Sequence, residues 1–98
     1  MHARFGEVRI KAGKVDEFVK IFRDEMMPQG RSQKGFKGVT VLADATANRA
    51  VLISFWETEA DAKAAGQSAG SFQAQVDKVA ALMDGPPKIE YLRVYHQE

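Results

Sequence analysis

The sequence predicts an α+β domain whose elements follow the order β-α-β-β-α-β. Three observations predict this class. Strand-like stretches occur near both ends of the chain and in its middle. Two other stretches carry apolar residues at helical spacing, and the second is interrupted around Gly66 and Gly70. Turn residues separate these stretches, and we expect residues 1–98 to form a single domain.

The first strand and the first helix occupy the N-terminal third of the chain. Residues 4–11 alternate, which places Gly6, Val8 and Ile10 on one face of a strand. After Ala12 and Gly13, the helical stretch carries apolar residues at its expected buried positions: Val15, Phe18, Val19, Phe22 and Met26. Pro28 and Gly30 are expected to end or kink this helix.

A hairpin is predicted in the middle of the chain. Strands at 36–43 and 49–57 flank the small polar residues 44–48, so the second strand should return antiparallel to the first. Residues 51–56 of the returning strand are almost continuously apolar. A strand that is apolar on both faces has both faces covered. The helices of this chain can cover one face, and a second subunit is the simplest cover for the other.

A broken helix and a final strand complete the pattern. Thr58 to Asp61 has the spacing of a capping box and opens an Ala-rich helix, which Ser71 can restart. A buried stripe is expected at Phe72, Val76, Val79, Ala80 and Met83. Residues 85–87, Gly-Pro-Pro, stop the helix, and residues 89–96 form the last strand. This order is that of the split βαβ, or ferredoxin-like, arrangement.

Composition excludes several classes of function. The formal net charge is +1, so the chain has no overall field that would attract nucleic acid or an acidic membrane surface. The chain contains no cysteine, which excludes disulfides, thiolate metal sites and a cysteine nucleophile. Residues 1–10 have no signal-peptide pattern, and no segment is long and apolar enough to span a membrane. We therefore expect a cytoplasmic protein.

Four stretches together resemble the antibiotic biosynthesis monooxygenase family. They read KAGKVDEFVKIF, RSQKGF, LISFWETEADAKAAGQSAGSFQAQV and DGPPKIEYLRVY, and they are spread over nearly the whole chain. The Phe-Trp-Glu exit from the third strand and the Gly-Pro-Pro stop are the most characteristic parts. The resemblance implies a ferredoxin-like protomer whose sheet pairs with that of a second copy, giving a homodimeric α/β barrel with its helices outside.

The same resemblance implies an activity, although family membership indicates fold more strongly than chemistry. Many members oxidise phenolic or polyketide-like substrates with oxygen and without a cofactor, and others have no known activity. We therefore expect a cofactor-independent monooxygenase acting on a small aromatic hydroxy compound, such as a hydroquinone. The alternatives are a non-catalytic or stress-associated homodimer that binds a small ligand, and a fold that serves mainly as an assembly unit.

Related haem-degrading enzymes use an Asn, a Trp and a haem-ligating His, and this chain departs from all three. The matching positions fall near Glu7 or Val8, near Gly66, and on Val76. The resemblance therefore disfavours haem oxygenation.

Candidate site residues fall into an apolar and a polar group. The expected pocket walls are Phe22, Met26, Trp56, Phe72 and Met83, and the alternative is that these side chains only fill the core. Glu7, Arg9 and Arg93 are charged residues on outer strands that should be neighbours. They are interpreted either as a proton acceptor with cationic partners or as a structural salt-bridge network. No catalytic base is assigned.

A metal site is not expected. His2 and His96 should lie near each other at the ends of the first and last strands, with Glu98 as the one further ligand close by. Two terminal histidines and one carboxylate make a poor metal site, so solvated chain ends are the favoured interpretation.

Overall fold

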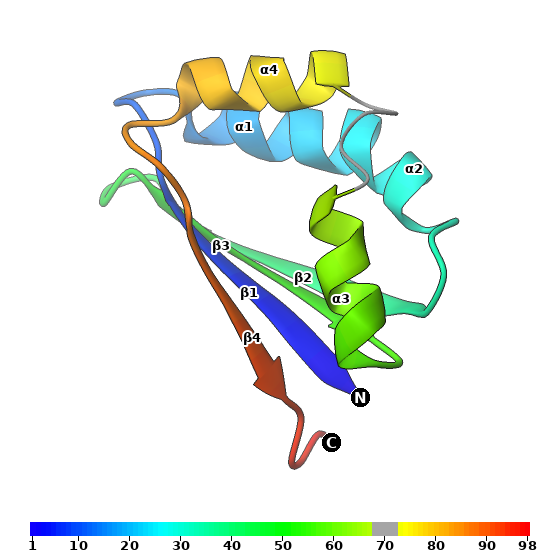
Figure 1. Ribbon diagram of the computed structural model, residues 1–98. Coiled ribbons are helices and arrows are strands. Elements are labelled where there is room, and N and C mark those ends of the chain that lie inside the picture. Colours follow the sequence, from blue (N-terminus) through cyan, green and yellow to red (C-terminus); the bar gives the residue numbers. More distant parts are fainter. Residues whose placement is uncertain (68–72) are drawn as a thin grey trace.

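The computed structural model describes residues 1–67 and 73–98, and its elements form two layers (Figure 1). One layer is an antiparallel sheet with the strand order β2-β3-β1-β4. The helices form the other layer and cover one face of this sheet. The strands are β1 (His2–Arg9), β2 (Phe36–Asp44), β3 (Arg49–Trp56) and β4 (Lys88–Arg93). The predicted ferredoxin-like α+β fold and the β2-β3 hairpin are thus confirmed.

Two strand boundaries differ from the sequence prediction. The first strand was expected at 4–11 but spans His2–Arg9, because its neighbour β3 begins opposite Arg9. Ile10 forms only an isolated bridge, to Met83. The last strand was expected to reach His96 but ends at Arg93, which lies opposite His2 at the start of β1. Beyond that point β4 has almost no partner strand left to pair with.

The first helical segment ends at Gly30, one of the two residues predicted to end or kink it. Helix α1 (Val15–Ile21) passes into a π-helical turn, η1 (Phe22–Met26), and then into α2 (Met27–Gly30). In a regular α-helix the ring of Pro28 would clash with the carbonyl four residues earlier. The wider π turn ends at Met26, two residues before that proline, and turns of this kind are frequent at functional sites.

The second helix is divided into α3 (Glu59–Gln67) and α4 (Gln73–Leu82). The predicted cap at Thr58 is present, because the backbone N–H of Asp61 donates to Thr58 Oγ1 at 3.1 Å. Ser71, Phe72 and the side chain of Val76 lie outside the described residues. On the rest of the predicted stripe Val79 is buried, Met83 is half-buried and Ala80 is exposed, whereas Leu82, which was not predicted, is buried.

The hydrophobic core lies where α1 and α4 pack side by side over β1 and β3 (Figure 1). Its buried residues are Val8, Ile10, Val15, Phe18, Ile21, Ala50, Val79 and Leu82. Ala80 differs from Leu82 because it faces an open cavity beside this core. Among the described residues, no helix combines the length and apolarity needed to cross a membrane.

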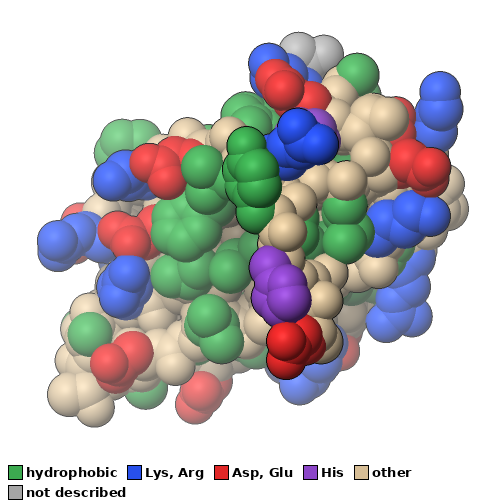
Figure 2. All heavy atoms as spheres, turned by 90° about the horizontal axis from the view of Figure 1, so that it is seen from below, with side chains coloured by type: hydrophobic (Ala, Val, Ile, Leu, Met, Phe, Trp, Pro, Cys, Tyr) green, Lys and Arg blue, Asp and Glu red, His purple; other side chains and the backbone are tan. Residues whose placement is uncertain are grey.

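The second face of the sheet is left uncovered by the chain's own helices. The register places Leu52, Ser54 and Trp56 on the helix side, and Val51, Ile53 and Phe55 of β3 on the opposite side. Figure 2, viewed from below the sheet, shows hydrophobic side chains over the middle of this face and charged ones toward its edges. We call it the open face; its apolar residues include Phe5, Val51, Ile53, Phe55, Leu42 and Leu92. Leu42 and Leu92 are 53% and 52% exposed.

Candidate functional site

A cavity of about 500 Å³, here called the central pocket, lies between the sheet and the helices. This volume is in the range of small-molecule sites, which are concave and mostly apolar. Residues from all four strands line its floor: Arg4, Gly6, Val8, Val39, Leu52, Ser54, Trp56 and Ile89. The helices supply its roof, chiefly through Phe18, Phe22, Met26, Met27, Val79 and Met83.

Four of the five predicted wall residues line the central pocket. Phe22 and Met26 are the first and last residues of the π-helical turn, so this turn sets the position of both. Trp56 lies at the end of β3, and Met83 follows α4. Phe72 lies outside the described residues. The four described side chains border this cavity, and their role as walls of a substrate pocket stays a prediction.

Trp56 is held in one orientation at the wall of the pocket. Its side chain is nearly buried, and its indole packs edge-to-face against Phe36 with ring centroids 5.5 Å apart. The indole Nε1–H donates a hydrogen bond to Ser54 Oγ at 2.8 Å. An aromatic contact and a hydrogen bond together fix a ring in a way that suits ligand binding.

Arg4 is a pocket residue that the sequence analysis did not select. It lies directly opposite Ser54 across the β1-β3 ladder, on the face that looks toward the helices. Its Nε atom is buried and has no hydrogen-bond partner. Of the described residues that line the pocket, Arg4 is the one with an ionisable side chain. The available signal was its position two residues before Gly6 and four before Val8, on the apolar face of β1.

Gly6 leaves room in the floor of the pocket next to Arg4. A Cβ atom at this position would lie 3.4 Å from Ile89 Cδ1 and 3.7 Å from the Leu52 carbonyl oxygen, which are ordinary packing distances. A larger residue is therefore sterically possible here. Its side chain would, however, occupy part of the space beside the guanidinium group.

The three residues of the predicted polar cluster are not brought together. Glu7 and Arg9 lie on the open face, whereas Arg93 is opposite His2, on the other face and at the far end of the sheet. The guanidinium of Arg93 instead lies over the ring of Tyr95, 5.5 Å from its centroid. Successive side chains of a strand point to opposite faces of the sheet, and the register decides which face each residue of β1 and β4 occupies.

Glu7 has other cationic partners on the open face. Arg49 Nη2 donates to Glu7 Oε2 at 2.6 Å. This hydrogen bond, helped by the charges of Arg49, Lys88 and Arg9, holds the pKa of the Glu7 carboxyl below its ordinary value of 4.5. The carboxylate faces away from the central pocket, so it is not placed to accept a proton from a ligand there.

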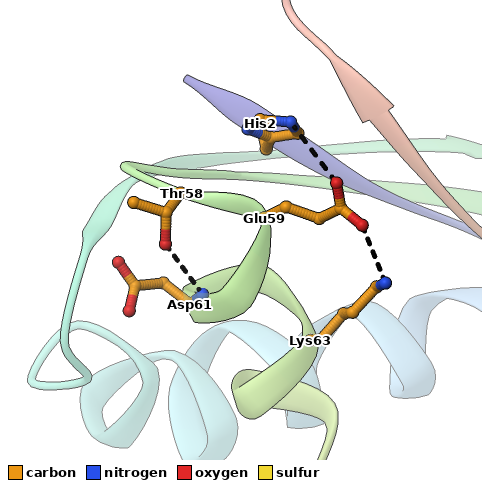
Figure 3. A network of polar contacts seen from close by, with 5 residues as sticks. All are labelled: His2, Thr58, Glu59, Asp61 and Lys63. Atoms are coloured by element: carbon orange, nitrogen blue, oxygen red, sulfur yellow. Dashed lines mark hydrogen bonds and ion pairs between the residues drawn. The ribbon is translucent and has the colours of Figure 1, made fainter.

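The two histidines contact different carboxylates. Figure 3 shows His2 directed at Glu59 of α3, with His2 Nε2 3.7 Å from Glu59 Oε2 and Lys63 Nζ 2.7 Å from Glu59 Oε1. His96 Nε2 lies instead 2.9 Å from Glu98 Oε1. Within residues 1–67 and 73–98 no group of three potential metal ligands is found.

Comparison with known proteins supplies a family match. The model of the family named antibiotic biosynthesis monooxygenase matches residues 1–78, which include β1 to β3 and the pocket residues on them. No curated protein sequence matches the chain.

Several solved structures are similar over almost the whole chain. A Nitrosomonas europaea protein that carries the same family description, provisionally, is 23% identical, with a TM-score of 0.81, and the match covers 98% of this chain and 100% of that one. SnoaB from Streptomyces nogalater, described as a cofactor-independent oxygenase and solved in a mutant form, is 18% identical (TM-score 0.79, 98% and 94% covered). The ActVA-Orf6 monooxygenase of Streptomyces coelicolor, solved with nanaomycin D, is 17% identical (TM-score 0.80, 99% and 89% covered).

Proposed function

The chain belongs to the antibiotic biosynthesis monooxygenase family, and from this premise we propose that it is a cofactor-independent monooxygenase. Its substrate is a small aromatic hydroxy compound, such as a hydroquinone or a polyketide-like phenol, bound in the central pocket. The observation that carries this proposal is the apolar cavity of about 500 Å³ with Trp56 fixed at its wall. SnoaB, which shares the fold, is described as a cofactor-independent oxygenase.

The proposed reaction needs no redox group from the protein, because the ionised substrate itself reduces oxygen. A phenol loses its hydroxyl proton, and the electron-rich ring passes electrons to O₂. One oxygen atom then replaces the hydrogen on a ring carbon as a carbonyl, while the other leaves as water. A phenol and O₂ thus give a quinone and H₂O, and both atoms and electrons balance.

Three features of the central pocket suit this chemistry. Phe22, Met26 and Trp56 offer apolar surface to a planar ring. Arg4 and the Ser54 hydroxyl offer hydrogen-bond donors to the substrate oxygen, and a nearby cation favours the ionised form. None of the described lining residues is a carboxylate or an imidazole, so the proton is released to solvent rather than to a side-chain base.

We further propose that the protein is a cytoplasmic homodimer in which each 98-residue chain is one domain. The open face supports the dimer, since it presents Phe5, Ile53 and half-exposed Leu42 and Leu92 to solvent in a single chain. Strand β4 lies outside the range of the family match but pairs with β1, which supports one folding unit.

Oxygen consumption tests the proposed activity. Metal-free and flavin-free protein is mixed with a panel of hydroquinones, anthrones and related phenols in an oxygen electrode, and the products are identified by mass spectrometry. Uptake that persists with a chelator and falls at least tenfold in Trp56→Phe is expected. A matched control is Tyr95→Phe, since Tyr95 is 88% exposed and does not line the pocket. Strict dependence on added flavin or metal would contradict the proposal.

The second candidate is a homodimer that binds a small aromatic ligand without turning it over. The lack of a side-chain base among the described pocket residues favours it. Tight binding of a phenol that is never oxidised would support this candidate, whereas quinone formation would exclude it.

A further inference from the structure

We infer that the central pocket takes an aromatic ligand that carries a negative charge, with Arg4 as its counter-ion. This inference rests on the proposed function, because it takes the central pocket as the ligand site. It concerns which ring compounds bind, and it can be tested without any oxygen chemistry.

The first support is the unmatched charge of Arg4. Its guanidinium is always ionised at physiological pH, yet the described part of the chain gives it no ion pair, and its Nε atom is buried without a partner. Two of the other three arginines on the sheet have a partner. Arg49 forms an ion pair with Glu7, and Arg93 lies over the ring of Tyr95, while Arg9 is exposed to solvent. A partly buried charge without a partner is costly, and an anionic ligand would remove that cost.

The second support is the donor set around this charge. Ser54 lies directly opposite Arg4, and both side chains line the pocket. Because Ser54 Oγ already accepts the indole hydrogen bond of Trp56, its own hydroxyl proton is left to donate. A guanidinium and a hydroxyl donor side by side complement a carboxylate or a phenolate oxygen. None of the described lining residues is an acid that would compete for Arg4.

The third support is the contrast with the rest of the lining. Phe22, Met26 and Leu52 make the neighbouring walls apolar, and Gly6 leaves open the floor next to Arg4. A ligand that fits has a flat apolar body and one anionic end. A carboxylate and a phenolate share this chemistry, and the experiment separates them.

Binding of a matched ligand pair tests the inference. Isothermal titration calorimetry at pH 7 compares 2-naphthoate with 2-naphthamide, which has nearly the same shape but no charge. The wild-type protein should bind the naphthoate about tenfold more tightly or better, as expected for a charge-assisted hydrogen bond. Arg4→Met should abolish this preference, and Arg4→Lys should keep part of it. Arg9→Met is the matched control, because Arg9 is exposed on the same strand but on the open face.

A second titration tests the phenolate. Ionised 4-nitrophenol absorbs visible light, so its apparent pKa can be followed when it is bound. Binding to the wild type should lower that pKa, and binding to Arg4→Met should not. The two arms separate the sources of the charge, because a pocket built for carboxylates shows the naphthoate preference without the nitrophenol shift.

The inference is overturned if the wild type shows neither a naphthoate preference nor a lowered pKa of bound nitrophenol, or if either effect survives unchanged in Arg4→Met. These results are distinct from failure of the proposed activity. Preferential naphthoate binding without oxygen uptake would support the inference and contradict the proposed activity. Oxidation of neutral phenols at the same rate by wild type and Arg4→Met would support the activity and contradict the inference.

Discussion

The indole N–H of Trp56 donates to the hydroxyl of Ser54 at 2.8 Å, although the two residues are neighbours on one face of the same strand. The bond ties the ring to its own strand while Phe36 supports it from β2. It therefore holds one wall of the central pocket in place before any ligand arrives, and it orients the Ser54 hydroxyl beside Arg4.

A double-mutant cycle on this pair should show coupling. Ser54→Ala leaves the part-buried indole N–H without an acceptor, which is expected to cost about 1–3 kcal/mol of unfolding free energy. Trp56→Phe removes the donor, so adding Ser54→Ala to it should cost less. Urea denaturation of the four proteins measures the coupling, expected at about 0.5–1.5 kcal/mol. Strictly additive losses would show that the hydrogen bond does not contribute.

Two glycines with a left-handed backbone should respond differently to alanine. Gly13 has φ +77° and no atom within 4 Å of an added Cβ, whereas Gly35 has φ +81° and the added Cβ would overlap with the Asp61 carboxylate. Gly13→Ala should cost only the backbone strain, about 1–2 kcal/mol. Gly35→Ala should cost roughly 1–3 kcal/mol more because of the overlap. Thermal and urea unfolding of the two variants measure the difference.

The overlap has its own control. Asp61→Ala removes the carboxylate, which is nearest to the new methyl group, but keeps a Cβ that would lie 2.8 Å from it, so Gly35→Ala combined with Asp61→Ala should recover only part of the excess cost. Equal destabilisation by Gly13→Ala and Gly35→Ala would mean that Asp61 does not crowd this turn.

Gly6→Ala should separate ligand binding from stability. The added methyl group meets its neighbours at packing distance, so the unfolding free energy should change by no more than about 1 kcal/mol. The same group enters the pocket floor beside Arg4, and the dissociation constant of 2-naphthoate should rise severalfold. Calorimetric titration of the variant checks this. Unchanged affinity would show that ligands do not reach this part of the floor.

The Glu59 carboxylate should make stability depend on acid pH. The hydrogen bond from Lys63, its charge and that of His2 hold the pKa of Glu59 below its ordinary value of 4.5 (Figure 3). A carboxyl whose pKa is lower in the folded state stabilises the fold above its unfolded pKa, and this contribution disappears as the pH falls through the folded value. The stability difference between wild type and Glu59→Gln should thus be fully present above pH 4.5 and should disappear as the pH falls through the lowered pKa of folded Glu59.

Lys63→Met tests the cause of this pH dependence. Without the lysine the pKa of Glu59 should return toward its ordinary value, so the variant should lose stability at neutral pH and little at low pH. Urea midpoints measured from pH 7 down to about pH 3 give the comparison. A stability difference that grows as the pH falls would contradict the assignment.

Ile53→Lys should dissociate the proposed dimer. Ile53 lies on the open face beside Phe5, its direct partner on β1. In a dimer the lysine would be buried without a partner, which carries a cost of several kcal/mol in order of magnitude, whereas in a monomer the side chain reaches water. Sedimentation velocity should show a dimer for wild type and a monomer for the variant. Lys11→Met serves as a control, because Lys11 is exposed beyond the end of β1.

The element order followed from local patterns that do not need long-range information. Alternation in β1, helical spacing in α1, the Thr58 cap and the Gly-Pro-Pro stop each act within a few residues. The strand ends could not be predicted from local patterns, because a strand ends where its partner ends, and the β1 partners of β4 lie 81 to 91 positions earlier in the chain.

The candidate site was predictable in its apolar part. Phe22, Met26, Trp56 and Met83 are large apolar residues at positions that face inward, and all four line the pocket. The polar part was not predictable. Grouping Glu7, Arg9 and Arg93 assumed that neighbouring strands present these residues to the same face, and the actual register places Arg93 on the opposite one.

The sequence by itself determined the family, the order of the strands and helices, and the apolar faces, because each of these is encoded in residue spacing or in local motifs. Only the tertiary structure decided that Arg4 and Ser54 face each other inside the pocket while Glu7 turns away from it. The physical reason is the two-residue period of a strand. A shift of one residue in register exchanges the two faces, and register is set by pairing between distant segments.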